Sequence, residues 1–341
     1  MRSIDRVRNV IAGRPVDHLP AQPMLMMFAS KHAGIEFIDY TKDGRLMAEA
    51  QLKIVEDYDL DCLLTCSDPA REVIDIAGDG SIDWFSDQGP AINEERAALT
   101  DKSRLKTFTV PDPMGGGRMH DRIKSIEIMY RHVLGEISIV GWIEGPLALA
   151  AELRGINNIM LDFMQDPPFV DDLLDFCAEV AIRYATPQIE AGADTIGMSD
   201  AAASVIGPKL YARFLQPRQK RVLAAIKEKH PAAITRLHMC GNTDVLIPKM
   251  KELPVDIFEL DFPADLVKAR ANLGPDKIIS GNVSTVYDLL EGTPESVYEA
   301  TRRCHEVSGK MHIVNSGCEV SPLTPPENLK ALMRYAKEHQ P

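Results

Sequence analysis

The sequence lacks any long apolar run. No stretch approaches the roughly 18 consecutive apolar residues that a membrane-spanning helix requires. The opening residues, Met1–Arg8, also lack the apolar centre of a secretory signal peptide. We therefore expect a cytoplasmic protein that has no membrane partner.

Positive charge and cysteine are both scarce. The chain has 38 Lys and Arg against 50 Asp and Glu, a net charge of −12, which argues against nucleic acid as the main partner. Six cysteines in 341 residues are too few for a disulfide framework. We expect each of them to be a buried thiol, a metal ligand or a nucleophile.

A dinucleotide-binding fingerprint is absent as well, because no Gly-x-Gly-x-x-Gly follows an early strand. Instead, strand-like and helix-like runs alternate along the chain. Eight strands are expected, at residues 19–27, 60–66, 137–143, 194–198, 233–240, 255–260, 277–282 and 311–314. Repeated βα units that close at eight predict an α/β fold, a TIM (β/α)8 barrel. A doubly wound open sheet would explain the alternation nearly as well, but it would carry the missing fingerprint.

Two segments lie outside the repeating pattern. Residues 4–12 alternate apolar and charged side chains at helical spacing, which predicts an N-terminal helical extension. Residues from about 75 to 117 are rich in Gly, Asp and Pro and fit the repeat badly. We interpret them as an insertion after the second strand, so that residues 1–341 form one domain.

The sequence around residue 238 suggests a metal site. His238 and Cys240 are two residues apart at the end of a predicted strand, so both side chains point to the same face. Cys318 follows another predicted strand. One imidazole and two thiolates are the ligand set of a catalytic zinc that keeps its fourth position open. The alternative is that these are ordinary buried residues, because buried cysteines are common.

Further polar residues follow other predicted strands, and a barrel brings such strand ends to one rim. Glu144 and Asp200 could be a fourth ligand, a carboxylate that orients His238, or a substrate-binding or catalytic acid. Alternatively, each caps a following helix. Asp261 is expected to contact substrate or cofactor. Either a ligand contact or a turn role is possible for Asp68, Asn242 and Asn282. For Asp68 the turn role is the better interpretation.

Motifs spread over nearly the whole chain resemble the uroporphyrinogen decarboxylase superfamily, and within it the zinc-dependent corrinoid methyltransferases. They are Arg6–Pro20, Gly145–Leu149, Ala191–Asp194, His238–Asn242, Ile279–Asn282, Gly317–Cys318 and Thr324–Leu329. The family fold is a TIM barrel, in agreement with the strand count.

The resemblance separates two branches. The decarboxylase branch carries arginines near its first strand to bind porphyrinogen carboxylates, and the corresponding residues 23–32 contain none. The His-x-Cys and distant Cys of the methyltransferase branch are all present. The resemblance therefore implies that His238, Cys240 and Cys318 are zinc ligands.

The implied activity is methyl transfer between a corrinoid, methylcobamide, and a zinc-activated thiol or related acceptor. No Asp-x-His-x-x-Gly corrinoid motif occurs here, which implies a separate corrinoid protein as partner. A metal-independent decarboxylase and a non-catalytic corrinoid-binding protein are the alternatives. Coenzyme M, another thiol and a folate all remain open as acceptor, as do the direction of transfer, the fourth zinc ligand and the oligomeric state.

Overall fold

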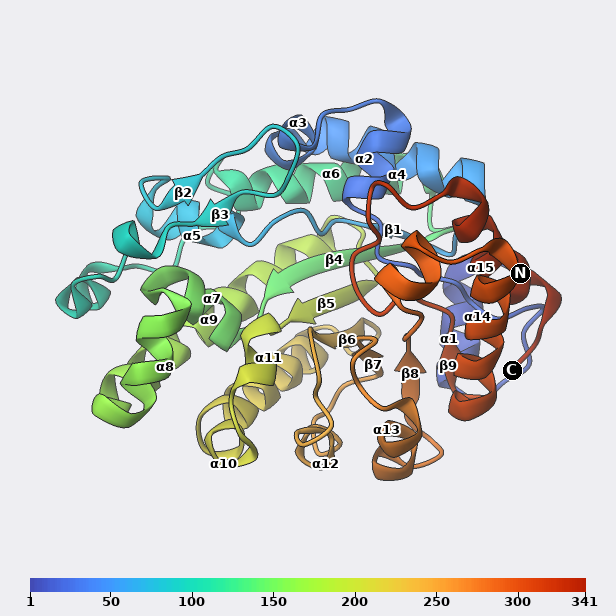
Figure 1. Cartoon of the computed structure of the whole chain (residues 1–341). Helices are drawn as coiled ribbons and strands as arrows, with labels where there is room; N and C mark the ends of the chain where they lie inside the picture. Colours follow the sequence, from blue (N-terminus) through green and yellow to red (C-terminus); the bar gives the residue numbers. More distant parts are fainter.

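Seven parallel strands form a curved sheet at the centre of the computed structural model, which describes residues 1–341. Strands that neighbour each other in this sheet also follow one another in the chain. Their bounds are β1 (Cys62–Leu64), β4 (Ser138–Glu144), β5 (Thr195–Ser199), β6 (Ile234–Met239), β7 (Ile257–Leu260), β8 (Ile278–Ser280) and β9 (His312–Ile313). Figure 1 shows the helices around the outside of this arc. The predicted α/β barrel architecture is confirmed.

The prediction of a first strand at residues 19–27 is wrong. Only Ala21 pairs in parallel, in a single bridge to Val314 beside β9. On its other side Ala21 accepts one hydrogen bond from the backbone N–H of Asp61 next to β1 (3.0 Å). Pro20 and Pro23 have no N–H to donate, so this segment closes the gap between β9 and β1 without forming a regular strand.

Helices surround the sheet and connect its strands. Their bounds are α1 (Ser3–Ile11), α2 (Met27–Ala33), α3 (Phe37–Lys42), α4 (Gly44–Tyr58), α5 (Ala70–Ala77), α6 (Arg118–Val133), α7 (Pro146–Arg154), α8 (Ile156–Gln165), α9 (Pro167–Glu190), α10 (Pro208–Leu210), α11 (Gln216–Lys229), α12 (Ile247–Met250), α13 (Leu266–Leu273), α14 (Pro294–Ser308) and α15 (Pro326–Glu338). Helix α1 confirms the predicted N-terminal extension. The shorter helical turns are η1 (Glu94–Arg96), η2 (Lys102–Thr107), η3 (Ala201–Val205), η4 (Tyr211–Leu215) and η5 (Thr285–Leu290).

The segment between α5 and α6 departs from the βα repeat. It contains a small antiparallel pair, β2 (Ile82–Asp83) with β3 (Ala91–Ile92), followed by η1 and η2. One apolar core of 81 buried residues extends from Leu19 to Ala336 and packs the helices on the sheet. The organisation of residues 1–341 as one domain stays a prediction. None of the helices is both long and apolar enough to span a bilayer.

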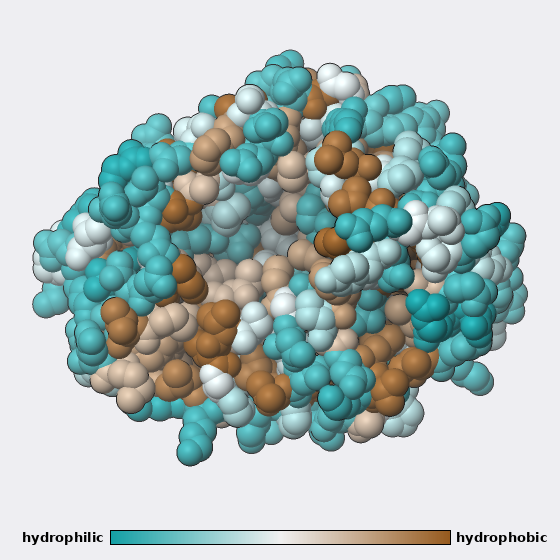
Figure 2. All heavy atoms as spheres, in the orientation of Figure 1, coloured by the Kyte–Doolittle hydropathy of each residue, from teal (hydrophilic) through white to brown (hydrophobic).

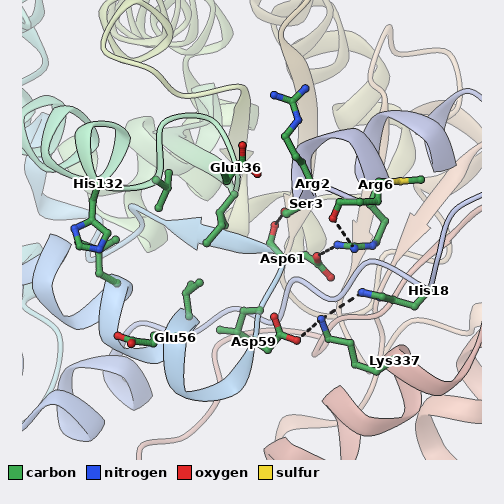
Figure 3. Close-up of a pocket in the computed structure, with 16 residues that line it drawn as sticks. Arg2, Ser3, Arg6, His18, Glu56, Asp59, Asp61, His132, Glu136 and Lys337 are labelled. Carbon is green, nitrogen blue, oxygen red and sulfur yellow. Dashed lines mark hydrogen bonds and ion pairs between the residues drawn. The ribbon is translucent and has the colours of Figure 1, made fainter.

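A pocket of about 510 Å³ lies at the end of the barrel where the strands begin (Figure 3). Its central charges are paired within the protein. Arg6 contacts both Asp17 and the buried Asp61, which directly precedes β1. Lys337 forms an ion pair with Asp59 (2.8 Å). These charges neutralise one another and join the N-terminal helix to the barrel. We therefore interpret this pocket as part of the packing between the helix and the barrel.

Candidate metal centre and active site

The structure brings His238, Cys240 and Cys318 together at the opposite end of the barrel. The Nε2 atom of His238 lies 3.2 Å from the Sγ atom of Cys240 and 3.8 Å from that of Cys318. The two sulfur atoms are 3.8 Å apart. All three ligand atoms therefore fall within 4.8 Å of one another, although the two cysteines are 78 residues apart in the chain.

Local backbone geometry explains this convergence. His238 is on β6, and Cys240 directly follows the strand, so alternation directs both side chains to the same face. Gly241 then reverses the chain with a φ of 81°, a conformation that glycine adopts readily. A side chain at Gly317 would lie 2.4 Å from the backbone nitrogen of Phe262, so only glycine permits this close approach of the loop that carries Cys318.

Asp261 connects the loops of the two cysteines. One of its carboxylate oxygens accepts a hydrogen bond from the N–H of Gly241 (2.6 Å). The other accepts one from the N–H of Phe262 and would lie 3.1 Å from a side-chain carbon at Gly317. We expected Asp261 to contact substrate or cofactor. In the structure its carboxylate holds the backbone beside the metal-ligand cluster, and a contact with substrate or cofactor stays a prediction.

A carboxylate to which the sequence analysis gave no role lies behind His238. Glu259 is opposite His238 in the register of β6 and β7, and its Oε1 atom is 3.3 Å from Nδ1 of His238. Its Oε2 atom is 3.0 Å from Arg236. Burial raises the pKa of Glu259, but Arg236 and His238 outweigh this effect and lower it below its usual value. A buried charge within the apolar run 255–260 was the signal that could have identified Glu259.

The cluster has the chemistry of a zinc site. Two sulfur donors and one imidazole nitrogen are ligands that zinc favours, and three protein ligands leave a fourth position for substrate. Nδ1 of His238 is buried and has no hydrogen-bond partner of good geometry, while Glu259 lies beside it. A carboxylate at this position is how proteins orient a metal-binding histidine. The residues present therefore fit a metal ion.

A pocket of about 310 Å³ opens beside the cluster. Met24, Met26, Met27, Phe37 and Trp142 form much of its apolar wall, and its acidic residues are Asp68, Glu144, Glu152 and Glu319. The ring centroid of Trp142 lies 6.2 Å from that of His238. Figure 2 shows that the face in view is hollowed at its centre, with apolar residues around the hollow.

Glu144 lies in this pocket, as expected for a residue at the end of β4. Its side chain is 6% exposed and forms no hydrogen bond or ion pair with the protein, so it caps no helix. Burial, and then the charge of nearby Glu72, raise the pKa of Glu144 well above its usual value. Glu152 on α7, which we did not predict, has a pKa raised by burial and by Glu144.

Asp200 has a different role from the ones we expected. It is fully buried, and one oxygen accepts hydrogen bonds from the N–H groups of Leu147 and Ala148 in the first turn of α7. The other oxygen accepts one from Gln219 (2.8 Å). Asp200 therefore caps α7, which precedes it in the chain, and it does not line the pocket. Both oxygens have structural partners, and a catalytic role of Asp200 stays a prediction.

The two predicted asparagines also have structural partners. Asn242 is exposed, and its side chain bonds to the N–H of Asp244 and the carbonyl of Pro263, as a turn residue does. Asn282 donates to the carbonyls of Asp261 and Ala264. Neither lines the pocket. These bonds stabilise the strand-end loops, and the ligand contacts expected of Asn242 and Asn282 stay predictions.

The predicted turn role of Asp68 is confirmed, because its side chain accepts a hydrogen bond from the N–H of Ala70 (3.1 Å). It also pairs with Arg118 through both oxygens, at 2.8 and 3.0 Å. Burial raises the pKa of Asp68, but the guanidinium groups of Arg118 and Arg71 outweigh burial and lower it to about 2. Asp68 is therefore a charged, fully paired carboxylate at the pocket wall.

Comparison with known proteins places this geometry in a family. The chain is 31% identical over 244 residues to the methylcobamide:CoM methyltransferase MtbA of Methanosarcina mazei, which covers 71% of this chain and 69% of that protein. It is 30% identical over 263 residues to the uroporphyrinogen decarboxylase of Synechococcus sp., covering 75% and 72%. A solved methyltransferase structure from Methanosarcina mazei has the same fold, with a TM-score of 0.89, 23% identity and 99% of both chains covered.

The family assignment covers nearly the whole chain. Residues 2–339 match the family described as uroporphyrinogen decarboxylase (URO-D). This match includes all three residues of the metal-ligand cluster and the strands that carry them. The protein therefore belongs to the uroporphyrinogen decarboxylase family.

Proposed function

We propose that this protein is a zinc-dependent methyltransferase that moves a methyl group between a corrinoid, methylcobamide, and a thiol. The observation that carries the proposal is the convergence of His238, Cys240 and Cys318 on one point beside a small pocket. The name of the relative MtbA supports the same activity. A zinc ion bound there would lower the pKa of a thiol substrate and hold it as a nucleophilic thiolate.

The protein's own residues would prepare the site for this reaction. Glu259 and Arg236 orient the ring of His238, while Asp261 holds the backbone beside Cys240. The apolar wall that includes Trp142 would limit the access of water to the reacting sulfur. In the transfer, the carbon–cobalt bond of the methylcobamide breaks, its electron pair stays on cobalt, and a sulfur–carbon bond forms. The reverse direction uses the same groups.

The size of the pocket supports a separate corrinoid protein as partner. A volume of about 310 Å³ suits a small molecule and is too small for a whole cobamide. The corrinoid would therefore present its methyl group at the mouth of the pocket. The loops that follow β1, β5, β6 and β9 all contribute residues to this pocket.

A metal-independent decarboxylase is the second candidate, because another relative is named uroporphyrinogen decarboxylase. The charge of the pocket counts against it. A porphyrinogen carries several carboxylates that need cationic partners, and no Lys or Arg lines the pocket. A corrinoid-binding protein without catalytic activity would have no chemical need for the His238, Cys240 and Cys318 cluster.

The test combines metal analysis with turnover. We expect close to one zinc per chain in the wild type, and its loss in His238→Ala and Cys318→Ser. The same variants should lose thiol-dependent demethylation of methylcobalamin, followed by its visible absorbance. Cys177→Ala, which changes a buried thiol outside the cluster, should keep both properties. Decarboxylation of a porphyrinogen by metal-free protein would favour the second candidate, and corrinoid binding that survives Cys318→Ser without turnover would favour the third.

A further inference from the structure

The pocket beside the metal-ligand cluster has an acidic polar lining. Its four acidic residues are Asp68, Glu144, Glu152 and Glu319. No Lys or Arg is among the residues that line it. Two cysteine thiolates and a neutral histidine would balance the charge of a zinc ion. An anionic substrate would therefore meet no positive side chain in this pocket.

The guanidinium groups of the arginines around this pocket are already paired with other groups of the protein. Arg118 pairs with both oxygens of Asp68, and Arg236 pairs with Glu259. Arg122 is fully buried and donates to the carbonyl of Trp142 (2.9 Å). Arg71 donates to Asp121 (2.9 Å) and to the carbonyl of Thr41. None of these arginines lines the pocket, and each has partners of its own.

The four carboxyl groups fall into two classes. Asp68 is paired with arginine, and Glu319 accepts hydrogen bonds from the N–H groups of Met26 and Met27. Glu144 and Glu152 have no hydrogen-bond or ion-pair partner in the protein, although Glu144 is only 6% exposed and Oε2 of Glu152 is buried. An unpartnered buried polar group costs free energy until a ligand satisfies it.

Building on the proposed function, we infer that the small substrate carries an ammonium group, as an aminothiol or its methyl thioether does. Its sulfur would lie at the His238, Cys240 and Cys318 cluster, and its ammonium group would pair with Glu144 and Glu152. Trp142 also lines this pocket. Methylation converts the thiol to a methyl thioether and leaves the ammonium group unchanged.

Binding of three thiols that share a two-carbon skeleton tests this inference without any methyl transfer. The probes are 2-aminoethanethiol, 2-mercaptoethanol and 2-mercaptoethanesulfonate, which are cationic, neutral and anionic at pH 7. Cobalt(II) in place of zinc reports sulfur ligation by a charge-transfer absorption band. We expect a Kd at least about tenfold lower for the cationic thiol than for the neutral one, since tenfold corresponds to about 1.4 kcal/mol. Equal or tighter binding of the sulfonate would overturn the inference.

An aminothiol also has a more acidic thiol, which by itself favours metal binding. The variants Glu144→Gln and Glu152→Gln separate the two causes, because each removes one carboxyl group from the pocket and leaves the thiol of the probe unchanged. We expect the ratio of the Kd values for the neutral and cationic thiols to fall several-fold in each variant. Glu49→Gln, on the exposed surface of α4, is the matched control and should keep the ratio. A ratio that is the same in all four proteins would overturn the inference.

Failure of the inference and failure of the proposed function give different results. If the cationic thiol binds more tightly and Glu144→Gln reduces this preference, but no thiol is methylated, the inferred substrate charge is supported and the proposed methyl transfer is contradicted. If every thiol is methylated and Glu144→Gln does not change the preference among the thiols, the proposed methyl transfer is supported and the inferred substrate charge is contradicted.

Discussion

Glu259 and His238 face each other on adjacent strands, with Oε1 of the carboxylate 3.3 Å from Nδ1 of the imidazole. This contact leaves Nε2 directed at the sulfur atoms of Cys240 and Cys318. Arg236, on the same strand as His238, holds the other carboxylate oxygen. The three buried side chains fix the ring before any metal binds, which reduces the reorganisation that binding requires.

Glu259→Gln should weaken zinc binding about 10- to 100-fold, because an amide orients and polarises the imidazole less well than a carboxylate. Competition with a chromophoric chelator would measure the zinc Kd. Glu252→Gln, on the exposed surface, changes the same functional group away from the cluster and should leave the Kd unchanged. Equal zinc affinity in wild type and Glu259→Gln would show that the contact has no role in metal binding.

Two features of the site could be predicted from the sequence because they depend on local geometry. The i, i+2 spacing of His238 and Cys240 on a strand fixes their common direction. The alternation of strands and helices brings the end of β9 to the same rim, and Cys318 with it. The apolar runs also predicted the strands correctly, except where Pro20 and Pro23 remove the donors that a strand needs.

The roles of the carboxylates could not be predicted, because they depend on contacts between distant segments. Asp200 caps α7, more than 50 residues earlier in the chain, and Asp261 binds the turn at Gly241. Both look like any other acid at a strand end. Glu259 differs in being charged within a buried run, yet only the register of β6 with β7 pairs it with His238. Side-chain partners therefore require the three-dimensional structure.

Arg6→Met should lower the free energy of unfolding by about 3–5 kcal/mol, because it leaves the buried carboxylate of Asp61 without its ion-pair partner. Urea unfolding would measure the change. Arg8→Met, on the exposed side of the same helix, should change stability by less than about 0.5 kcal/mol. The double variant Arg6→Met with Asp61→Asn should lose less unfolding free energy than the sum of the losses in the two single variants. Strict additivity of these losses would argue against the pairing.

The ion pair of Asp68 should make stability depend on pH in acid. Its folded pKa of about 2 lies below the usual value of 3.8, so the unfolded chain binds the proton more readily between these values. The resulting stabilisation, roughly 2 kcal/mol, is present above about pH 4 and is lost as the pH falls towards 2. The difference in unfolding free energy between wild type and Asp68→Asn should therefore shrink over this range.

Urea unfolding of wild type and Asp68→Asn at several pH values between 7 and 2.5 would follow this change. Asp87→Asn, at an exposed position without an ion pair, is the matched control and should differ from wild type by a small, constant amount. A difference for Asp68→Asn that stays constant with pH would contradict the assignment of a charged, paired carboxylate.

Gly197→Ala should disturb the packing of Trp142 against the metal-ligand cluster. A side-chain carbon at Gly197 would lie 2.4 Å from the indole ring, which is 1% exposed and cannot move into solvent. Overpacking of this kind costs about 1–3 kcal/mol of stability. In a Trp84→Phe background, Trp142 is the sole tryptophan, so its emission reports the change directly. Gly80→Ala meets no atom within 4 Å and should leave stability and emission unchanged. If Gly197→Ala also leaves both unchanged, Trp142 is not confined beside His238 as described.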